Sequence, residues 1–299
     1  MKIFVLGGSG FLGWNLISDI RWNHEIYSTY FNHPFELGGV KSIYFDINDF
    51  QSLETEIIHF NPDLIINCAG LSKISPCRHN PALAFKLNCE SVYKLAILCE
   101  KLKIKLIHFS TDLVYSGDSS PYNENSETIP KSIYGKTKLL SENIIKSFSS
   151  DFVILRASLL YGWGNKHTES FVDWLSSAAK ENRDIRLYYD QFRSMFYVKD
   201  AAKVIDSIIG SGIKNQIFNL GGFEKISRYE FGVKFFELFY PNNRNIIKSS
   251  VKDECNAEQL GIDCTMNISK LEQLLDFKPR CLIEGLDDMK NTLQGKELI

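Results

Sequence analysis

Short apolar runs alternate with longer amphipathic stretches along most of the chain. The apolar runs predict buried strands at residues 2–6, 25–31, 41–46, 63–70, 106–111, 185–191 and 216–221. The amphipathic stretches predict helices at residues 11–20, 50–60, 81–102, 169–182 and 198–209. Strands that alternate with helices are typical of an α/β fold with a doubly wound parallel sheet, which is Rossmann-like. Such a sheet binds its ligand at the carboxyl ends of the strands.

The second half of the chain is expected to add a smaller lobe to this sheet. No linker rich in glycine and serine divides the sequence, so the two parts are expected to share one folding unit. We assign 1–162, completed by parts of 195–222, to a dinucleotide-binding domain, and 163–194 with 223–299 to a smaller α/β substrate-binding lobe. Ser227 with Glu230, and Ser269 with Glu272, have the spacing of capping boxes that open helices. The cleft between the two parts is the expected substrate site.

A glycine-rich turn follows the first predicted strand. Its glycines have GxxGxxG spacing, which allows a tight turn, close approach of a pyrophosphate and close packing of the next helix on the sheet. The free N–H groups at the start of that helix then bind the anion. The residues expected to form this dinucleotide site are Gly7, Ser9, Gly10, Phe11, Leu12 and Gly13. Similar turns also occur without a ligand, so this pattern needs support from other motifs.

Tyr134 and Lys138 lie four positions apart in the sequence, which places them on the same face of a helix. A nearby ammonium favours the phenolate and brings a tyrosine pKa of about 10 toward the range that suits acid–base catalysis. YxxxK also occurs by chance on surface helices. In a doubly wound sheet, however, the glycine turn, Asp46, Gly70, Thr111 and Tyr134 all belong to one rim. The sequence therefore predicts proton transfer beside a bound dinucleotide.

Several motifs occur together in a characteristic order. They are Gly7-x-x-Gly10-x-x-Gly13, Phe45-Asp46-Ile47, Asn67-Cys-Ala-Gly70, Ser110-Thr-Asp-Leu-Val-Tyr115, Tyr134-Gly-Lys-Thr-Lys138, Arg156-Ala-Ser-Leu-Leu-Tyr-Gly162 and Asp190-Gln191-Phe192. Over nearly its whole length the chain resembles the extended short-chain dehydrogenase/reductase family, and within it the sugar-nucleotide reductases of the dTDP-4-dehydrorhamnose reductase type. The resemblance implies an oxidoreductase that reduces a 4-keto-6-deoxy nucleotide sugar in the synthesis of a surface polysaccharide precursor.

The resemblance also implies roles for individual residues. Tyr134 corresponds to the acid that protonates the substrate carbonyl, Lys138 to the residue that lowers its pKa and binds the nicotinamide ribose, and Thr111 to a hydroxyl that polarises the carbonyl. Asp112 contacts the substrate in one interpretation and caps the next turn in the other. Besides the glycine turn, Tyr134 and Lys138, the residues implied to bind cofactor are Tyr30, Asp46, Ile47, Cys68, Ala69, Gly70 and Ser110.

Residues near Thr111 distinguish between related reactions. Similar 4,6-dehydratases need an Asp-Glu pair after the threonine, whereas this chain has Asp112-Leu113. Similar epimerase-reductases place a cysteine near the catalytic hydroxyl, and residues 110–117 contain none. Plain ketone reduction remains the preferred reaction. A nucleotide-sugar 4-epimerase stays an alternative, as does a non-catalytic regulatory protein like the β subunit of methionine adenosyltransferase.

The chain departs from the reductase pattern after Phe192 and at Ser75-Pro76, where those reductases often have Asp-Lys, so the identity of the sugar stays open. Arg193 stands where those reductases have a glycine, and it is a candidate for gripping a substrate phosphate, with an exposed arginine as the alternative. No acid that would repel a 2′-phosphate stands at residues 30–33, so NADPH is preferred and NAD is the alternative. His33 or Lys41 is expected to supply positive charge there.

Composition narrows the possible partners and the compartment. The 299 residues are 44% hydrophobic and carry a formal net charge of −2, with scattered lysines, so a nucleic-acid partner is not expected. No apolar run approaches the ~20 residues that span a bilayer, and a strand beginning at residue 2 leaves no room for a signal peptide. We therefore expect a cytoplasmic protein without a membrane partner, with a homodimer as an open option. Seven cysteines without CxxC pairs, and histidines without HxxxH spacing, predict reduced thiols and no metal site.

Overall fold

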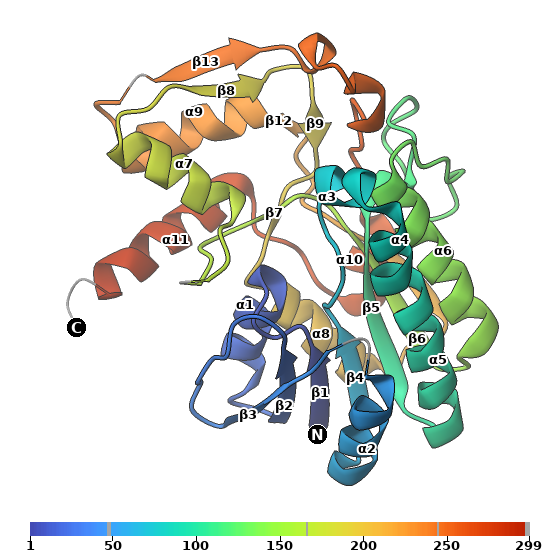
Figure 1. Ribbon diagram of the computed structural model, residues 1–299. Helices are drawn as coiled ribbons and strands as arrows, with labels where there is room; N and C mark the ends of the chain where they lie inside the picture. The colour runs from blue at the N-terminus through green and yellow to red at the C-terminus, as the bar shows by residue number, and fades with distance from the viewer. Residues whose placement is uncertain (47–48, 166, 244, 297–299) are drawn as a thin grey trace.

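The computed structural model describes residues 1–46, 49–165, 167–243 and 245–296. Its main feature is a parallel sheet of seven strands in the order β11-β6-β5-β4-β1-β2-β3 (Figure 1). The strands are β1 (Lys2–Leu6), β2 (Glu25–Tyr30), β3 (Val40–Tyr44), β4 (Leu64–Asn67), β5 (Lys105–Thr111), β6 (Phe152–Ala157) and β11 (Gln216–Leu220). All neighbouring pairs are parallel, which confirms the predicted doubly wound α/β fold.

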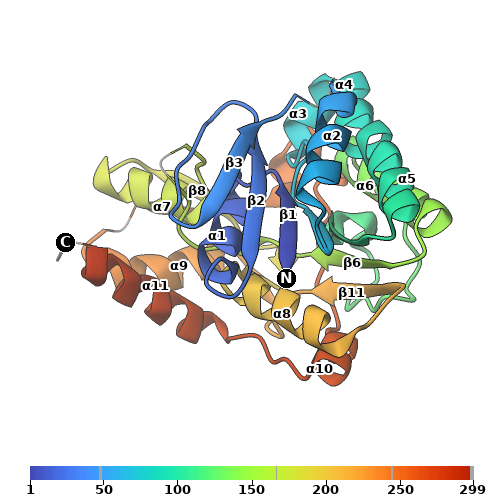
Figure 2. The same cartoon turned by 90° about the horizontal axis from the view of Figure 1, so that it is seen from below.

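Helices cover both faces of this sheet (Figure 2). One face carries α1 (Phe11–Ile20), α8 (Asp200–Ser211) and α10 (Ser269–Leu275), whose apolar side chains pack on Ile3, Val5 and Phe218. The other face carries α2 (Phe50–Phe60), α5 (Ser91–Leu102) and α6 (Ile133–Phe148), packed on Phe4, Ile65 and Ile154. The short helix α4 (Pro81–Phe85) contacts α6. A sheet covered on both sides needs strands that are apolar on both faces, and the fully buried β4 and β6 satisfy this requirement.

The remaining elements build a smaller lobe beyond the carboxyl ends of the strands, at the top of Figure 1. Its helices are α7 (Phe171–Lys180), α9 (Arg228–Phe239) and α11 (Leu282–Lys296). Its strands form three short pairs: β7 (Leu160–Tyr161) with β10 (Phe196–Tyr197), β9 (Phe192–Arg193) with β12 (Ile226–Ser227), and β8 (Ile185–Tyr188) with β13 (Ile246–Ser249). A separate apolar core that includes Val172, Leu175 and Phe231 holds the lobe together. The division of the chain into domains by residue range stays a prediction.

The structure confirms two local predictions and contradicts one. The chain is helical throughout 81–102, as predicted, with a π-helical turn, η1 (Lys86–Glu90), between α4 and α5 that periodicity does not reveal. Ser269 does not cap α10; it is the first residue of that helix, and its N–H group donates to Asn267 Oδ1 at 2.9 Å. Ser227 and Glu230 do form the expected capping box at the start of α9.

Shorter elements complete the chain. They are α3 (Ile74–His79) and the 3₁₀ turns η2 (Asp112–Val114), η3 (Val251–Asp253) and η4 (Ala257–Gln259). Among the residues that the structure describes, none of the helices is both long enough and apolar enough to span a membrane.

Candidate active site

The glycine turn between β1 and α1 has the shape that a dinucleotide requires. Gly7 has φ +81°, a value that side chains disfavour, and a Cβ on Gly13 would lie 2.3 Å from the Gly7 carbonyl oxygen. The helix therefore packs closely against the turn only because residue 13 is glycine. Gly10 caps α1 without a side-chain hydrogen bond, so the first N–H groups of the helix are not capped by a side chain. The turn thus fits a bound pyrophosphate, as the sequence suggested.

The loop after β4 forms the next part of the rim. Asn67 Oδ1 accepts from the Ala69 N–H at 3.0 Å, and Gly70 has φ +149°. Asn88, which lies in the π-helical turn, accepts from the Leu71 N–H at 2.8 Å through Oδ1. Its Nδ2 donates to Thr137 Oγ1 on α6 at 3.0 Å. Asn88 therefore ties the loop after β4 to the helix that carries Tyr134.

Thr111 and Tyr134 lie side by side at the carboxyl edge of the sheet. Thr111 ends β5, and its hydroxyl donates to Asp112 Oδ1 at 3.1 Å. The same hydroxyl lies close enough to the Tyr134 phenol to act on the pKa of that phenol. The close approach depends on Gly135, because a Cβ there would lie 2.2 Å from the Leu113 carbonyl oxygen. Ser132 fixes the first turn of α6 by accepting from the Gly135 N–H at 3.0 Å. Two of the three residues expected to be catalytic therefore converge.

The third residue, Lys138, is directed elsewhere in this structure. Its Nζ lies 3.0 Å from His108 Nε2, deep under the sheet edge, and both residues are buried. The sequence predicted that the ammonium would lower the pKa of Tyr134. Here the pKa of that phenol is raised, chiefly by burial and further by the Asp112 charge, while the Thr111 hydrogen bond opposes the rise. The effect of the Lys138 ammonium on Tyr134 beside a bound cofactor therefore stays a prediction.

The hydrogen bonds of His108 determine which protonation state of the Lys138 amine fits beside it. Asn67 Oδ1 accepts from the Ala69 N–H. The Nδ2 group of Asn67 is therefore the donor toward His108 Nδ1, 3.2 Å away. The ring proton then belongs on Nε2, where Ser141 Oγ lies at 3.1 Å. An N–H on Nε2 opposes a neighbouring ammonium, so this contact favours release of the Lys138 proton as the pH rises. Burial correspondingly lowers the pKa of Lys138 to about 8, against the opposing charge of Glu142.

Sequence reasoning did not single out His108. The available signal was one polar residue inside the otherwise apolar run of β5, and the strand is buried over this stretch. Ser110 on the same strand also has a different environment from the one expected. Its hydroxyl donates to Glu142 Oε1 at 2.6 Å, inside a buried pair in which Arg156 Nη2 lies 2.7 Å from Glu142 Oε2. Ser110 therefore stabilises the join between β5 and α6 in this structure.

Asp112 and Arg193 form a buried ion pair across the cleft. Arg193 Nε lies 3.2 Å from Asp112 Oδ2, and its two Nη atoms donate to the carbonyl oxygens of Phe192 at 2.7 Å and Leu260 at 2.8 Å. With only 4% of the residue exposed, this guanidinium has no open fork for a phosphate. Burial raises the pKa of Asp112, and the Arg193 charge opposes that rise. The alternative of a surface arginine is excluded, and Arg193 holds Asp112 in place.

Arg228, at the start of α9, was not found from the sequence. Its Nε donates to Gln191 Oε1 at 2.6 Å, and its guanidinium lies 5.2 Å from the centre of the Phe171 ring. Burial lowers the pKa of Arg228 to about 10, and the charge of Arg193 adds to this effect. Arg193 and Arg228, both from the lobe, therefore lie near the Asp112 carboxylate.

The ends of β2 and β3 form the side of the rim where the sequence predicts the adenosine. Tyr30 packs edge-on against Tyr44, with ring centres 6.2 Å apart, and Asp46 is the second residue after β3. Ile47, also expected to bind cofactor, lies outside the described residues. Cys68 lies next to the β4 edge, where burial raises the pKa of its thiol to about 12. Phe11 and Leu12 occupy the first turn of α1.

Comparison with known proteins finds relatives named for polysaccharide and glycan biosynthesis. It is 27% identical over 237 residues to the spore coat polysaccharide biosynthesis protein SpsK of Bacillus subtilis, covering 79% of this chain and 78% of that protein. It is 27% identical over 261 residues to the probable low-salt glycan biosynthesis reductase Agl14 of Haloferax volcanii, covering 84% of each. The crystal structure of dTDP-4-dehydrorhamnose reductase from Bacillus anthracis in complex with NADP superposes with a TM-score of 0.83 at 23% identity, covering 97% of this chain and 99% of that one, and shows a common fold.

The family models agree with these similarities. The model described as the RmlD substrate binding domain matches residues 1–294, which is almost the whole chain. The chain therefore belongs to the RmlD substrate-binding-domain family.

Proposed function

We propose that this protein is an NADPH-dependent reductase of a 4-keto-6-deoxy nucleotide sugar that serves the synthesis of a surface polysaccharide, with NADH as an alternative cofactor. The observation that carries the proposal is the pairing of the Thr111 hydroxyl with the Tyr134 phenol beside a glycine turn that fits a pyrophosphate. The names of the relatives support the same chemistry, because they include a glycan biosynthesis reductase and a dTDP-4-dehydrorhamnose reductase bound to NADP.

The chain supplies the groups that a carbonyl reduction needs. The reduced nicotinamide supplies the hydride. Tyr134 donates a proton to the carbonyl oxygen, and Thr111 donates a hydrogen bond to the same oxygen and aligns it. Lys138 has to leave His108 before its charge can act on the phenol, and its flexible four-carbon stem permits that rotation.

Arg228 is our candidate for the substrate phosphate. Arg193, the residue suggested by the sequence, is engaged by Asp112 and two carbonyl oxygens, so we assign it to the positioning of Asp112. The charges of Arg193 and Asp112 act on the pKa of Arg228, so the three side chains lie near one another, and Arg228 is the first residue of α9 in the lobe. A planar guanidinium binds phosphate oxygens through two parallel hydrogen bonds.

Leu113 argues against dehydration, because the position after Asp112 offers no second carboxylate. A 4-epimerase and a regulatory protein remain the alternatives, and one assay separates them from the reductase. Purified protein is mixed with NADPH and a panel of 4-keto-6-deoxy nucleotide sugars, and absorbance of the reduced nicotinamide is followed. A reductase consumes NADPH stoichiometrically with product. An epimerase interconverts 4-hydroxy nucleotide sugars without net consumption, and a regulatory protein binds nucleotide without turning over any sugar.

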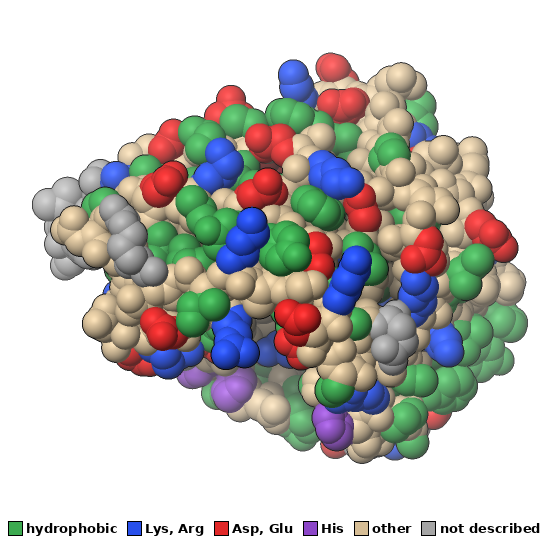
Figure 3. All heavy atoms as spheres, turned by 90° about the horizontal axis from the view of Figure 1, so that it is seen from above, with side chains coloured by type: hydrophobic (Ala, Val, Ile, Leu, Met, Phe, Trp, Pro, Cys, Tyr) green, Lys and Arg blue, Asp and Glu red, His purple; other side chains and the backbone are tan. Residues whose placement is uncertain are grey.

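A homodimer would cover an apolar surface on the helices beside the sheet. Tyr93 and Ile97 on α5, with Leu140 and Phe148 on α6, are exposed, and the Tyr93 and Phe148 rings contact edge-on at 4.9 Å. An apolar surface of this kind is typical of an interface between copies. We further propose a cytoplasmic location, because all seven cysteines are free thiols, a state that reducing compartments preserve. The face seen from above mixes both signs of charge and gives no continuous cationic track for nucleic acid (Figure 3).

A further inference from the structure

Two histidines from distant segments meet beside the adenosine end of the rim. His33 follows the end of β2, and His167 lies in the loop that leads into α7. Their imidazole rings are stacked, with centres 4.9 Å apart and planes only 2° from parallel. Both side chains are exposed. The contact joins the sheet to the lobe without involving the catalytic residues.

Hydrogen bonds fix both histidine segments next to the glycine turn. The Gly8 N–H donates to the Thr29 carbonyl oxygen at 2.9 Å, which holds the end of β2 against the turn. From the other side, Asn165 Nδ2 donates to the Ser9 carbonyl oxygen at 2.9 Å. The His167 N–H in turn donates to Asn165 Oδ1 at 2.8 Å. The two rings therefore flank the region beyond the turn.

This region has a defined role in doubly wound folds. The adenosine ribose lies at the end of the second strand, where an acid binds the 2′-hydroxyl of NAD or a basic residue accommodates the 2′-phosphate of NADP. Residues 30–33 read Tyr-Phe-Asn-His, with no acid, lysine or arginine. Any positive charge that this short segment itself provides therefore comes from His33.

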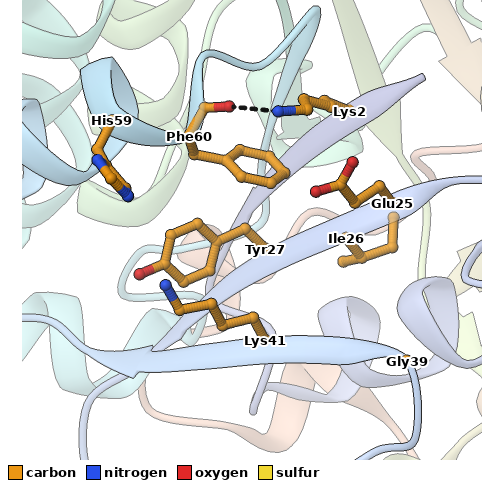
Figure 4. A pocket seen from close by; sticks show the side chains of 8 residues that line it. All are labelled: Lys2, Glu25, Ile26, Tyr27, Gly39, Lys41, His59 and Phe60. Atoms are coloured by element: carbon orange, nitrogen blue, oxygen red, sulfur yellow. Dashed lines mark hydrogen bonds between the residues drawn. The ribbon is translucent and has the colours of Figure 1, made fainter.

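Lys41, the other candidate, belongs to a different place. Its Nζ lies 4.5 Å from the centre of the Tyr27 ring, in a pocket that Lys2, His59 and Phe60 also line (Figure 4). Tyr27 precedes the end of β2 by three residues, or about 10 Å along a strand. Lys41 therefore points toward the amino ends of the strands and away from the rim.

We propose that His33 and His167 together bind the 2′-phosphate of NADPH and give the protein its cofactor preference. Imidazole N–H groups donate hydrogen bonds to phosphate oxygens. Because one ring comes from the sheet and the other from the lobe, binding of the phosphate also joins the two parts over the adenosine. The inference deepens the proposed function, because it concerns the cofactor of the same site.

Binding of two small probes tests the inference without any turnover. Adenosine 2′,5′-bisphosphate and adenosine 5′-monophosphate differ only in the 2′-phosphate, and calorimetric titration gives the affinity of each. We expect the wild-type protein to prefer the bisphosphate. His33→Ala and His167→Ala should each weaken the bisphosphate roughly ten-fold or more, as for lost hydrogen bonds to a charged group. Affinity for the monophosphate should stay within about two-fold, as for other surface substitutions, and the exposed His59→Ala serves as the matched control.

A charge reversal gives a second, independent readout. His33→Asp should invert the preference, so that NADH binds more tightly than NADPH in a nicotinamide fluorescence titration, because a carboxylate accepts the 2′-hydroxyl and repels the phosphate. Equal affinity of the wild-type protein for both probes would overturn the inference. The inference would also be overturned if the two histidine variants lost affinity for both probes equally, or kept their affinity for both. Failure of every keto sugar to react would instead remove only the proposed function, since the probes report binding alone.

Discussion

The buried Lys138 ammonium is expected to lower the free energy of unfolding of the protein. Its pKa falls from 10.5 to about 8 on folding, mainly because the ammonium is buried. A pKa lowered this far corresponds to roughly 3 kcal/mol of unfavourable free energy whenever the buried lysine is protonated. Replacement by methionine removes the charge but keeps an unbranched apolar stem, and His108 Nε2 retains Ser141 Oγ at 3.1 Å. Lys138→Met should therefore raise the free energy of unfolding at pH 7 by roughly 2–3 kcal/mol.

The pH dependence gives this prediction its sign. At pH 7 both folded and unfolded chains hold the Lys138 proton, so the penalty is fully present. Between pH 8 and 10.5 the folded state releases the proton first, so the stability contribution of the wild-type lysine rises and the gap to the variant closes. Urea unfolding at pH 7 and pH 9.5, without nucleotide, measures both gaps. Lys136→Met on the exposed side of α6 is the matched control and should change little at either pH.

Two results would refute this reasoning. A Lys138→Met protein that is less stable than wild type at pH 7 would mean that the amine contributes more through its contact with His108 than its burial costs. A stability gain of the same size at both pH values would mean that the effect comes from packing and that the lysine charge plays no part.

Three further predictions concern other parts of the site. Tyr134→Phe should lower the rate of carbonyl reduction by about 10²–10⁴-fold with unchanged NADPH affinity in a fluorescence titration, and unchanged turnover would remove Tyr134 from its assigned role. Glu142→Ala should destabilise the protein by about 3–5 kcal/mol in urea unfolding, because Arg156 is left buried without its partner, while the double variant Glu142→Leu with Arg156→Met should recover most of the loss. Gly13→Ala should weaken dinucleotide binding and lower the melting temperature, because its Cβ would lie 2.3 Å from a carbonyl oxygen, whereas Gly210→Ala, with open space around it, should be tolerated or stabilising.

The sequence predicted the parts of the site that depend on local spacing. The glycine turn depends on Gly7, Gly10 and Gly13, which are close together in the sequence. Tyr134 lies near Thr111 because β5 and α6 follow one another in a regular α/β order. The alternation of strands and helices likewise predicted the parallel sheet. These features depend on residues close in sequence or on rules of connection that few folds violate.

The partners of buried polar groups could not be predicted in the same way. Lys138 contacts His108, and Arg193 contacts Asp112, across 30 or more residues of chain. Periodicity assigns such residues to elements but carries no information on which side chain fills a given cavity. The same limit applies to Arg228, which only the packing of α9 on the lobe brings toward Asp112. Spacing therefore predicted the backbone frame, and tertiary contacts decided which charges meet.

The π-helical turn at Lys86–Glu90 has a consequence for how this protein can vary. The turn holds one more residue than an α-helical turn, and Asn88 within it bonds both the loop after β4 and α6. Deleting any one residue of the turn would restore a regular helix and rotate Asn88 away from both partners. Substitutions along this helix can accumulate one at a time, but a change in its length would disturb both the loop after β4 and α6, which carries Tyr134. We therefore expect natural variants to differ here in residue type and not in residue number.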